Sequence, residues 1–189
     1  MIKKFFSLMI LTAMIFFAHN AFAAPNITYQ VHVQDYGWMS SVSNGAVAGT
    51  TGKDKRVEAI VISSPDEIEY NAHVQNIGWQ GWIRSGGVAG TVGEGLRMEA
   101  IRIRLTGSLA DRYDVYYRAH VQNIGWQDWV SNGTMAGTEG EGLRMEALQI
   151  EIVEKGSHHH HQRHGRDRYG RDKYDRDRHD RERYDDYRW

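Results

Sequence analysis

One sequence unit occurs three times in the chain, and this repetition constrains the fold more than any other feature. The copies occupy residues 32–59, 73–100 and 120–147 and align without a gap; the second reads HVQNIGWQGWIRSGGVAGTVGEGLRMEA. A residue type that recurs at the same offset in all three copies serves the shared unit. In the third copy these are His120, Val121, Gln122, Gly125, Trp126, Ala136, Gly137, Thr138, Arg144, Glu146 and Ala147. No catalytic nucleophile is among them.

The motifs HVQNIGW, AGT and LRMEA, repeated in tandem, resemble the ChW family, the clostridial hydrophobic repeats of exported proteins with an invariant tryptophan. The resemblance covers residues 27–153. It implies a non-catalytic surface or secreted module that binds polymers or other proteins, and it implies no particular ligand. The first copy departs from the pattern, because Ser41 stands where Trp82 and Trp129 stand and residues 53–55 replace the Gly-Glu-Gly turn. We therefore expect the first copy to bind least.

Residues 1–23 have the features of an export signal. Lys3 and Lys4 precede an apolar run over residues 5–18, and Ala21-Phe22-Ala23 forms a small-x-small cleavage site. The apolar run is short for a membrane span. We therefore expect cleavage after Ala23, no membrane span in the mature protein, and a secreted, cell-surface or periplasmic location.

Residues 24–154 are predicted to form one domain of three repeats, at about 27–63, 68–105 and 115–153. Cysteine is absent, so no disulfide stabilises this exported chain. A body of about 130 residues can bury a core that one repeat of about 40 could not, so we expect a single cooperative unit. Ten Lys and Arg residues face sixteen Asp and Glu in this range, which argues against nucleic acid as a partner.

The hydrophobic pattern within each repeat has the period of a β-strand. Apolar and polar residues alternate over 68–75 and again over 115–122, and no stretch has helical spacing. Asn44-Gly45, Asn132-Gly133 and Gly86-Gly87 are predicted hairpin turns, as are the Gly-Glu-Gly segments at 93–95 and 140–142. The phase of alternation slips at Ala100-Ile101, which predicts a β-bulge.

Three such units predict an all-β, closed fold with three-fold pseudosymmetry, because closure removes the exposed edge strands of an open array. A β-trefoil is the first choice and a β-prism the second. The linkers 63–67 and 106–114 are expected to be loops between the units.

The shared histidines, His32, His73 and His120, lie on the polar side of the first strand of each repeat. One interpretation is a three-histidine zinc site on the pseudosymmetry axis. The favoured one is a half-buried imidazole bonded to a backbone carbonyl or to the shared glutamate (Glu58, Glu99, Glu146). The shared arginine (Arg56, Arg97, Arg144) comes two residues before that glutamate, which predicts a surface Arg–Glu ladder of modest value, with a pair that holds sugar hydroxyls as the alternative.

The tryptophans divide into two groups. Trp38, Trp79 and Trp126 occur in every repeat and are predicted to be core, since each would bury on the order of 200 Å². Trp82 and Trp129 occur in two repeats only, beside polar residues, which predicts exposed stacking platforms. The neighbouring hydrogen-bonding candidates are Gln80, Gln127, Asp128, Asn76 and Asn123.

No organised catalytic site is found. The chain lacks cysteine, a serine in an elbow motif and a phosphate-binding glycine loop. A glycosidase pair of carboxylates is the remaining alternative, but one glutamate repeated three times is more typical of a scaffold than of an acid and a base in distinct environments. We therefore expect a protein that is not an enzyme and has no cofactor.

Residues 155–189 differ in composition from the rest of the chain. From Arg166 a five-residue pattern, RDRYG, RDKYD, RDRHD, RERYD, carries mixed charge without aliphatic residues, which predicts disorder. A histidine tract precedes it and is a candidate for weak Zn²⁺ or Ni²⁺ binding, through His158, His159, His160, His161 and His164.

These features predict a non-catalytic binding module that recognises polysaccharide or cell-wall polymer through exposed tryptophans. The alternative is a protein assembly or adhesion module that binds surface proteins, with a self-associating or metal-capturing tail.

Overall fold

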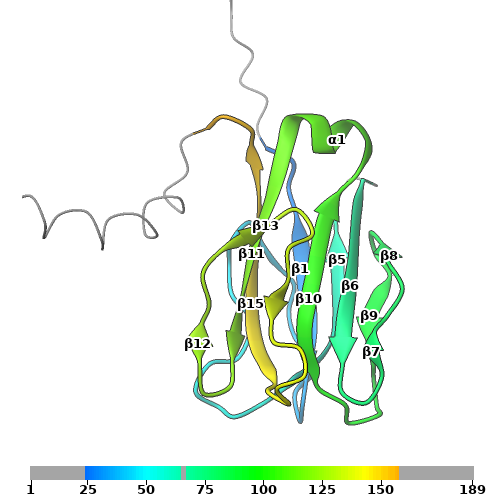
Figure 1. The fold of residues 1–189 in the computed structure, drawn as a ribbon, viewed down its shortest axis with the longest axis vertical. Coiled ribbons are helices and arrows are strands. Elements are labelled where there is room, and N and C mark those ends of the chain that lie inside the picture. Colours follow the sequence, from blue (N-terminus) through cyan, green and yellow to red (C-terminus); the bar gives the residue numbers. More distant parts are fainter. Residues whose placement is uncertain (1–23, 65–66, 158–189) are drawn as a thin grey trace, which may run out of the picture.

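The computed structural model describes residues 24–64 and 67–157 (Figure 1). Repeat 1 contains β1 (Thr28–Val33), β2 (Gly37–Trp38), β3 (Val42–Ser43), β4 (Ala48–Gly49) and β5 (Val57–Ser63). Repeat 2 contains β6 (Ile68–Val74), β7 (Gly78–Trp79), β8 (Ile83–Arg84), β9 (Val88–Gly90) and β10 (Met98–Leu105). Helix α1 (Gly107–Arg112) leads into repeat 3, with β11 (Tyr113–Val121), β12 (Gly125–Trp126), β13 (Val130–Ser131), β14 (Ala136–Gly137) and β15 (Met145–Glu154).

The predicted export signal and histidine tract lie outside the described residues, as does the five-residue pattern that follows the tract. Within residues 24–64 and 67–157, no helix is long and apolar enough to cross a membrane.

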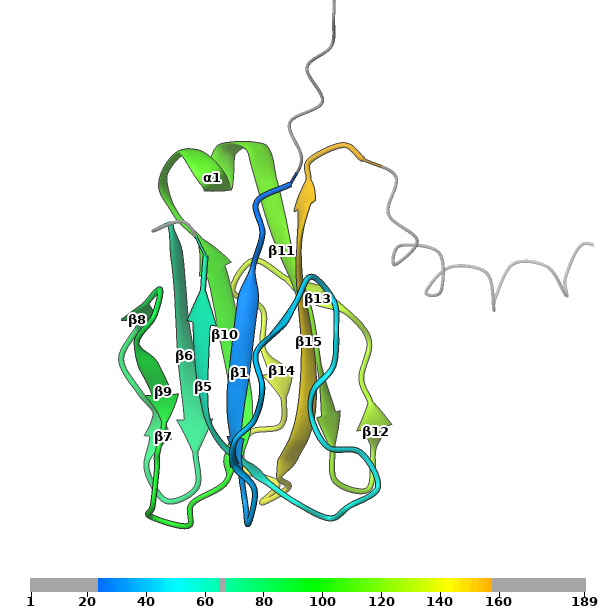
Figure 2. The ribbon, with the colours of Figure 1, turned by 180° about the vertical axis from the view of Figure 1, so that it is seen from behind.

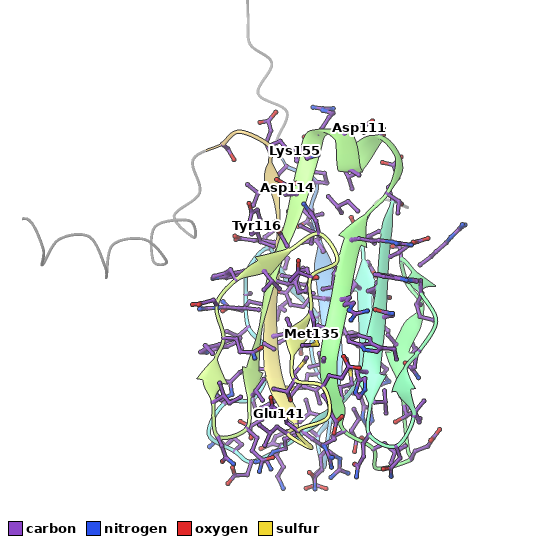
Figure 3. The ribbon with its side chains drawn as sticks, viewed as in Figure 1. Asp111, Asp114, Tyr116, Met135, Glu141 and Lys155 are labelled. Atoms are coloured by element: carbon purple, nitrogen blue, oxygen red, sulfur yellow. The ribbon has the colours of Figure 1, made fainter. Side chains whose placement is uncertain are left out.

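Each repeat is built on two long antiparallel strands, β1 with β5, β6 with β10, and β11 with β15. Buried and half-buried residues alternate strictly along β11, and the apolar residues are the buried ones. The predicted strand periodicity is therefore confirmed. The six long strands run along the long axis of the molecule, with α1 and both ends of the described chain at one end (Figures 1 and 2). Asp111 and Lys155 mark this end and Glu141 the opposite one (Figure 3).

The three repeats are joined by cyclic exchange of a short strand. Each sheet takes the two long strands of one repeat and the Ala-Gly strand of the next, so that β9 pairs with β5 and β14 pairs with β10. The ring closes when β4 of repeat 1 pairs with β15 of repeat 3. One hydrophobic cluster contains buried residues from all three repeats. Each long strand that a single repeat would leave as a free edge is thus covered by its neighbour.

The described residues form three separate antiparallel sheets and no closed barrel. The barrel that defines a trefoil, the first choice from the sequence, is therefore not present in this part of the chain. The prism, with three sheets around one core, stays a prediction.

The Asn-Gly turns have the predicted backbone but do not form hairpins. Asn132 and Gly133 both have positive φ, at 47° and 85°. However, β13 before this turn pairs with β11, while β14 after it pairs with β10 of the preceding repeat. The turn carries the chain from one sheet to another, and the Gly-Glu-Gly segment carries it back. In repeat 2 the matching pair is Ser85-Gly86, one residue before the predicted Gly86-Gly87.

A β-bulge occurs at the shared glutamate of every repeat. In repeat 2, Met98 pairs with Val74 and Ala100 with His73, so Glu99 is the extra residue. The bulge predicted from the sequence is therefore confirmed, one position earlier than expected. A bulge re-aims a side chain out of strict alternation, and here it directs a carboxylate toward the histidine on the neighbouring strand.

Helix α1 was not predicted, because its six residues are too few to show a helical period and only Leu109 is buried. Its first turn is held from outside, since the Glu67 carboxylate accepts hydrogen bonds from the backbone N–H groups of Ser108 and Leu109. Glu67 lies about 40 residues before the helix in the sequence, just ahead of β6, so the residues next to the helix carry no sign of this cap.

Candidate functional site

In each repeat, four shared side chains form one connected group on the outer side of the sheet. In repeat 2, Arg97 Nε donates to Glu99 Oε1 at 2.9 Å, and His73 Nδ1 lies 3.1 Å from Glu99 Oε2. The ring of Trp79 meets the His73 ring edge-on, with centroids 5.3 Å apart. Equivalent groups are formed in repeat 1 by Trp38, His32, Glu58 and Arg56, and in repeat 3 by Trp126, His120, Glu146 and Arg144.

The shared histidine approaches the shared glutamate in all three repeats, at 3.0, 3.1 and 3.2 Å, so the predicted pairing is found but the predicted hydrogen bond is not. The approach of Nδ1 lacks the geometry of a hydrogen bond, so the contact is electrostatic when the imidazole is charged. No group of three metal-ligating side chains is found among residues 24–64 and 67–157, and the three-histidine zinc interpretation has no support there.

The Arg–Glu pair is not the surface ladder that the sequence predicted. Glu99 is 5% exposed although it lies on the outer face, because its carboxylate contacts Arg97 and His73, and Glu146 is 4% exposed. One oxygen faces the arginine and the other faces the histidine. The pair therefore has little surface with which to hold sugar hydroxyls, and its place is structural.

The prediction that the shared tryptophans form the core is wrong. Trp38 is 39% exposed, and Trp79 and Trp126 are half-buried outside the hydrophobic cluster. Each tryptophan pairs across strands with the shared histidine, as Trp79 does with His73. Directly paired residues share one face of a sheet, so the polar histidine keeps its tryptophan partner on the outer face.

The second tryptophans lie on the surface near arginine side chains. Trp82 is 38% exposed, and the guanidinium of Arg104 lies 4.0 Å from its ring centroid. Trp129 is half-buried, and the guanidinium of Arg118 lies 4.9 Å from its centroid and 4.8 Å from that of Trp126. Such cation–π contacts orient an indole that the core does not hold.

The arginine that stacks on the first tryptophan changes strand between repeats 2 and 3. In repeat 2, Arg102 on β10 lies 4.0 Å from the centroid of Trp79, with Asn71 opposite it on β6. In repeat 3 the cation, Arg118, is on β11, with Gln149 opposite on β15. These arginines were not predicted, although the alternation of apolar and polar residues and the predicted strand pairing place them on the outer face. Repeat 1 has neither a second tryptophan nor an arginine at these places.

The predicted hydrogen-bonding residues differ in how available they are. Gln80 bonds to both backbone groups of Gly90, at 2.7 and 3.1 Å, and Gln127 bonds to Gly137 in the same way. These amides hold the crossover within their own repeat. Asn76 and Asn123 are exposed, with φ of 63° in the turn that follows the first long strand. Asp128 is exposed beside Trp129.

A tyrosine also lies three residues before the shared histidine in every repeat, and its role was not predicted because it precedes the 28-residue shared unit. Tyr29, Tyr70 and Tyr117 are buried in the core. Each hydroxyl accepts a backbone N–H from the preceding repeat in the ring, from Ile150, Ile62 and Ile103 in that order. Each donates to a carbonyl of its own crossover segment, from Ala46, Gly87 and Thr134. The tyrosines therefore bond the repeats together.

The tyrosines predict a loss of stability in alkali. Burial raises the pKa of Tyr29 and Tyr117 to about 12 from 10.0, and raises that of Tyr70. The unfolded chain therefore loses these protons first, so the stabilisation is complete below pH 10 and is lost as the pH rises to about 12. Tyr117→Phe should remove about 2 kcal/mol of this dependence.

Denaturant unfolding at pH 8, 10 and 11.5 measures this effect. At pH 8 the Tyr117→Phe variant should be less stable by about 1–3 kcal/mol, because two buried backbone groups lose their partner. Tyr116→Phe, next in the chain on the outward side of β11, is the control for general alkaline effects. Equal pH slopes for the parent and Tyr117→Phe would contradict the prediction.

Comparison with known proteins identifies the repeats. A model of the family described as Clostridial hydrophobic W matches residues 32–63, 73–107 and 120–154, which together make up more than half of the chain. No curated protein and no solved structure matches the chain. The three matches coincide with the three structural repeats, and the chain belongs to the Clostridial hydrophobic W (ChW) family.

Proposed function

We propose that this ChW domain is a non-catalytic module, secreted or on the cell surface, that binds polysaccharide or cell-wall polymer through Trp82 and Trp129. The observation that carries the proposal is the orientation of these indoles by guanidinium groups on the outer faces of two sheets. An apolar plane edged by polar groups suits a sugar ring. Trp82 is 38% exposed. The fold does not require a tryptophan at this position, since repeat 1 has Ser41 there.

The positions of the two platforms favour a polymer over a small ligand. The β7–β8 segment, which contains Trp82, and the β12–β13 segment, which contains Trp129, lie on opposite flanks of the molecule in Figure 1. One short ligand would contact one platform. A polymer with many equivalent sites engages both, and linked weak sites raise each other's effective concentration.

Alanine substitutions test this proposal. Trp82→Ala and Trp129→Ala should each weaken the retention of the domain on insoluble wall polysaccharide, while the free energy of unfolding changes by about 1 kcal/mol or less. The double variant should lose about a hundredfold in apparent affinity, because avidity is lost with the second platform. Pull-down isotherms and thermal melts of the same samples measure both quantities. A stable double variant that binds like the parent would contradict the proposal.

A different surface favours the second candidate, a protein assembly or adhesion module. Tyr36, Ile77 and Ile124 occupy equivalent positions in the turns after β1, β6 and β11, and they are 55%, 51% and 50% exposed. These turns all lie at the end of the molecule opposite α1 (Figures 1 and 2). Exposed apolar side chains gathered at one end are typical of protein interaction sites. If Ile77→Ser/Ile124→Ser abolishes wall retention and the tryptophan variants do not, this candidate replaces the first.

A further inference from the structure

We propose that the platform of repeat 2 selects an anionic polymer, whose carboxylate or phosphate groups meet three arginines around Trp79 and Trp82. This inference rests on the proposed function, because it assumes that Trp82 is a ligand platform. We call Arg84, Arg102 and Arg104 the arginine patch. Arg84 and Arg104 pair with Glu69 from the two sides of β6, in one row across the sheet. Arg102 is two residues before Arg104 on β10 and therefore points to the same face.

The patch is incompletely neutralised. Glu69 Oε2 lies 2.6 Å from Arg104, and Glu69 Oε1 lies 3.9 Å from Arg84. The Arg84 side chain is 85% exposed. Among the described residues, no carboxylate lies within ion-pair distance of Arg102, which stacks on Trp79. Three guanidinium groups thus face one carboxylate, in a domain that otherwise carries more acidic than basic residues.

The other two repeats lack this charge at the same positions. The three patch positions hold Ser43, Val61 and Ser63 in repeat 1 and Ser131, Gln149 and Glu151 in repeat 3. In repeat 3, Arg118 hydrogen-bonds Gln149 at 2.8 Å, and Asp128 adds a negative charge beside Trp129. The shared fold therefore does not require the arginines. A guanidinium is suited to carboxylate and phosphate groups, whose oxygens accept two parallel hydrogen bonds.

The test uses polygalacturonate and the same polymer after full methyl esterification, so that the sugar is kept and the negative charge is removed. The mature chain with its tail should bind polygalacturonate at least about fivefold more tightly at low salt, which is the value of a few exposed ion pairs. Arg84→Ser/Arg102→Gln introduces the residues of repeat 3 and should abolish this preference while leaving affinity for the methyl ester unchanged. Arg104 is kept, because it covers Trp82 and pairs with Glu69.

A matched control removes two positive charges elsewhere. Lys53→Gln/Lys55→Gln changes the net charge of the domain equally, in a loop of repeat 1, and should retain the preference for polygalacturonate. Poly(glycerol phosphate) forms a further arm: a parallel loss in the arginine variant would identify phosphate as an accepted group, and binding unaffected by the variant would restrict the patch to carboxylates.

The remaining outcomes overturn the proposal. A parent that binds both polymers equally would overturn the anion selectivity and leave the tryptophan platform standing. A preference that survives in the arginine variant would assign it to residues 155–189, where eleven Lys and Arg exceed eight Asp and Glu, or to another surface. A parent that binds none of the three polymers would overturn this inference, while retention of the same protein on insoluble wall polysaccharide would still decide the proposed function.

Discussion

Gly137→Ala should lower the free energy of unfolding by about 3–5 kcal/mol. Gly137 has φ of 105°, a region that residues with a Cβ rarely occupy. Its place in β14 is against the bulge of repeat 2, where an added Cβ would lie 2.3 Å from the Glu99 carbonyl oxygen and 2.6 Å from Ala100 Cα. Both are backbone atoms, so relief requires the exchanged strand to move away and to open the joint between repeats 2 and 3.

Gly140→Ala is the matched control in the same repeat. Gly140 also has positive φ, at 78°, but an added Cβ meets nothing within 4 Å. It should therefore cost only the backbone strain of about 1 kcal/mol. Chemical denaturation of both variants separates strain from close approach. Equal destabilisation by the two substitutions would show that the contact between repeats is not what requires glycine at position 137.

The same joint explains how far the sequence could predict the fold. Strand periodicity, three-fold repetition and the bulge near Glu99 are local patterns, and each is found in the structure. The exchange of β4, β9 and β14 is not local. An Asn-Gly turn with positive φ at both residues is typical of a hairpin. The residues of the turn do not indicate that the following strand pairs with another repeat. The shared Ala-Gly-Thr motif was the missing clue, because a strand of small residues suits a close approach.

The candidate site was predicted in part for a similar reason. The shared residues predicted a histidine hydrogen-bonded to the glutamate or to a backbone carbonyl, and each histidine lies beside its glutamate without a hydrogen bond from Nδ1. The predicted burial of two residues was wrong: Trp79 was expected in the core and is half-buried, and Glu99 was expected at the surface and is buried. The size of an indole suggested the core and the charge of a carboxylate suggested the surface, whereas the bulge and the cross-strand pairing with His73 reverse both. A carboxylate normally prefers the surface, but it can be buried where an opposite charge pairs with it, as Arg97 does with Glu99.

Glu146→Ala should destabilise the domain by about 3–5 kcal/mol, because it removes the buried acceptor of Arg144 and the carboxylate beside His120. Glu146 is 4% exposed, Arg144 donates to its Oε1 from Nε at 3.0 Å, and Nη2 of the same guanidinium lies 2.8 Å from that oxygen as an ion pair. The Arg144 side chain is only 18% exposed, so water can replace the lost carboxylate only partly. Glu146→Gln keeps the volume and one acceptor and should recover part of the loss.

Arg144 has a second carboxylate partner, which serves as the control. Asp54, in the loop of repeat 1, lies 2.9 Å from Nη2 of Arg144, but its side chain is 92% exposed. Gly95 and Gly142 occupy the equivalent position in repeats 2 and 3, and Asp54 shares their positive φ. Asp54→Gly should therefore change the free energy of unfolding by less than about 1 kcal/mol, since an exposed pair contributes little and the backbone strain is relieved. Comparable losses for Glu146→Ala and Asp54→Gly would mean that burial of the carboxylate does not set the value of its pair with Arg144.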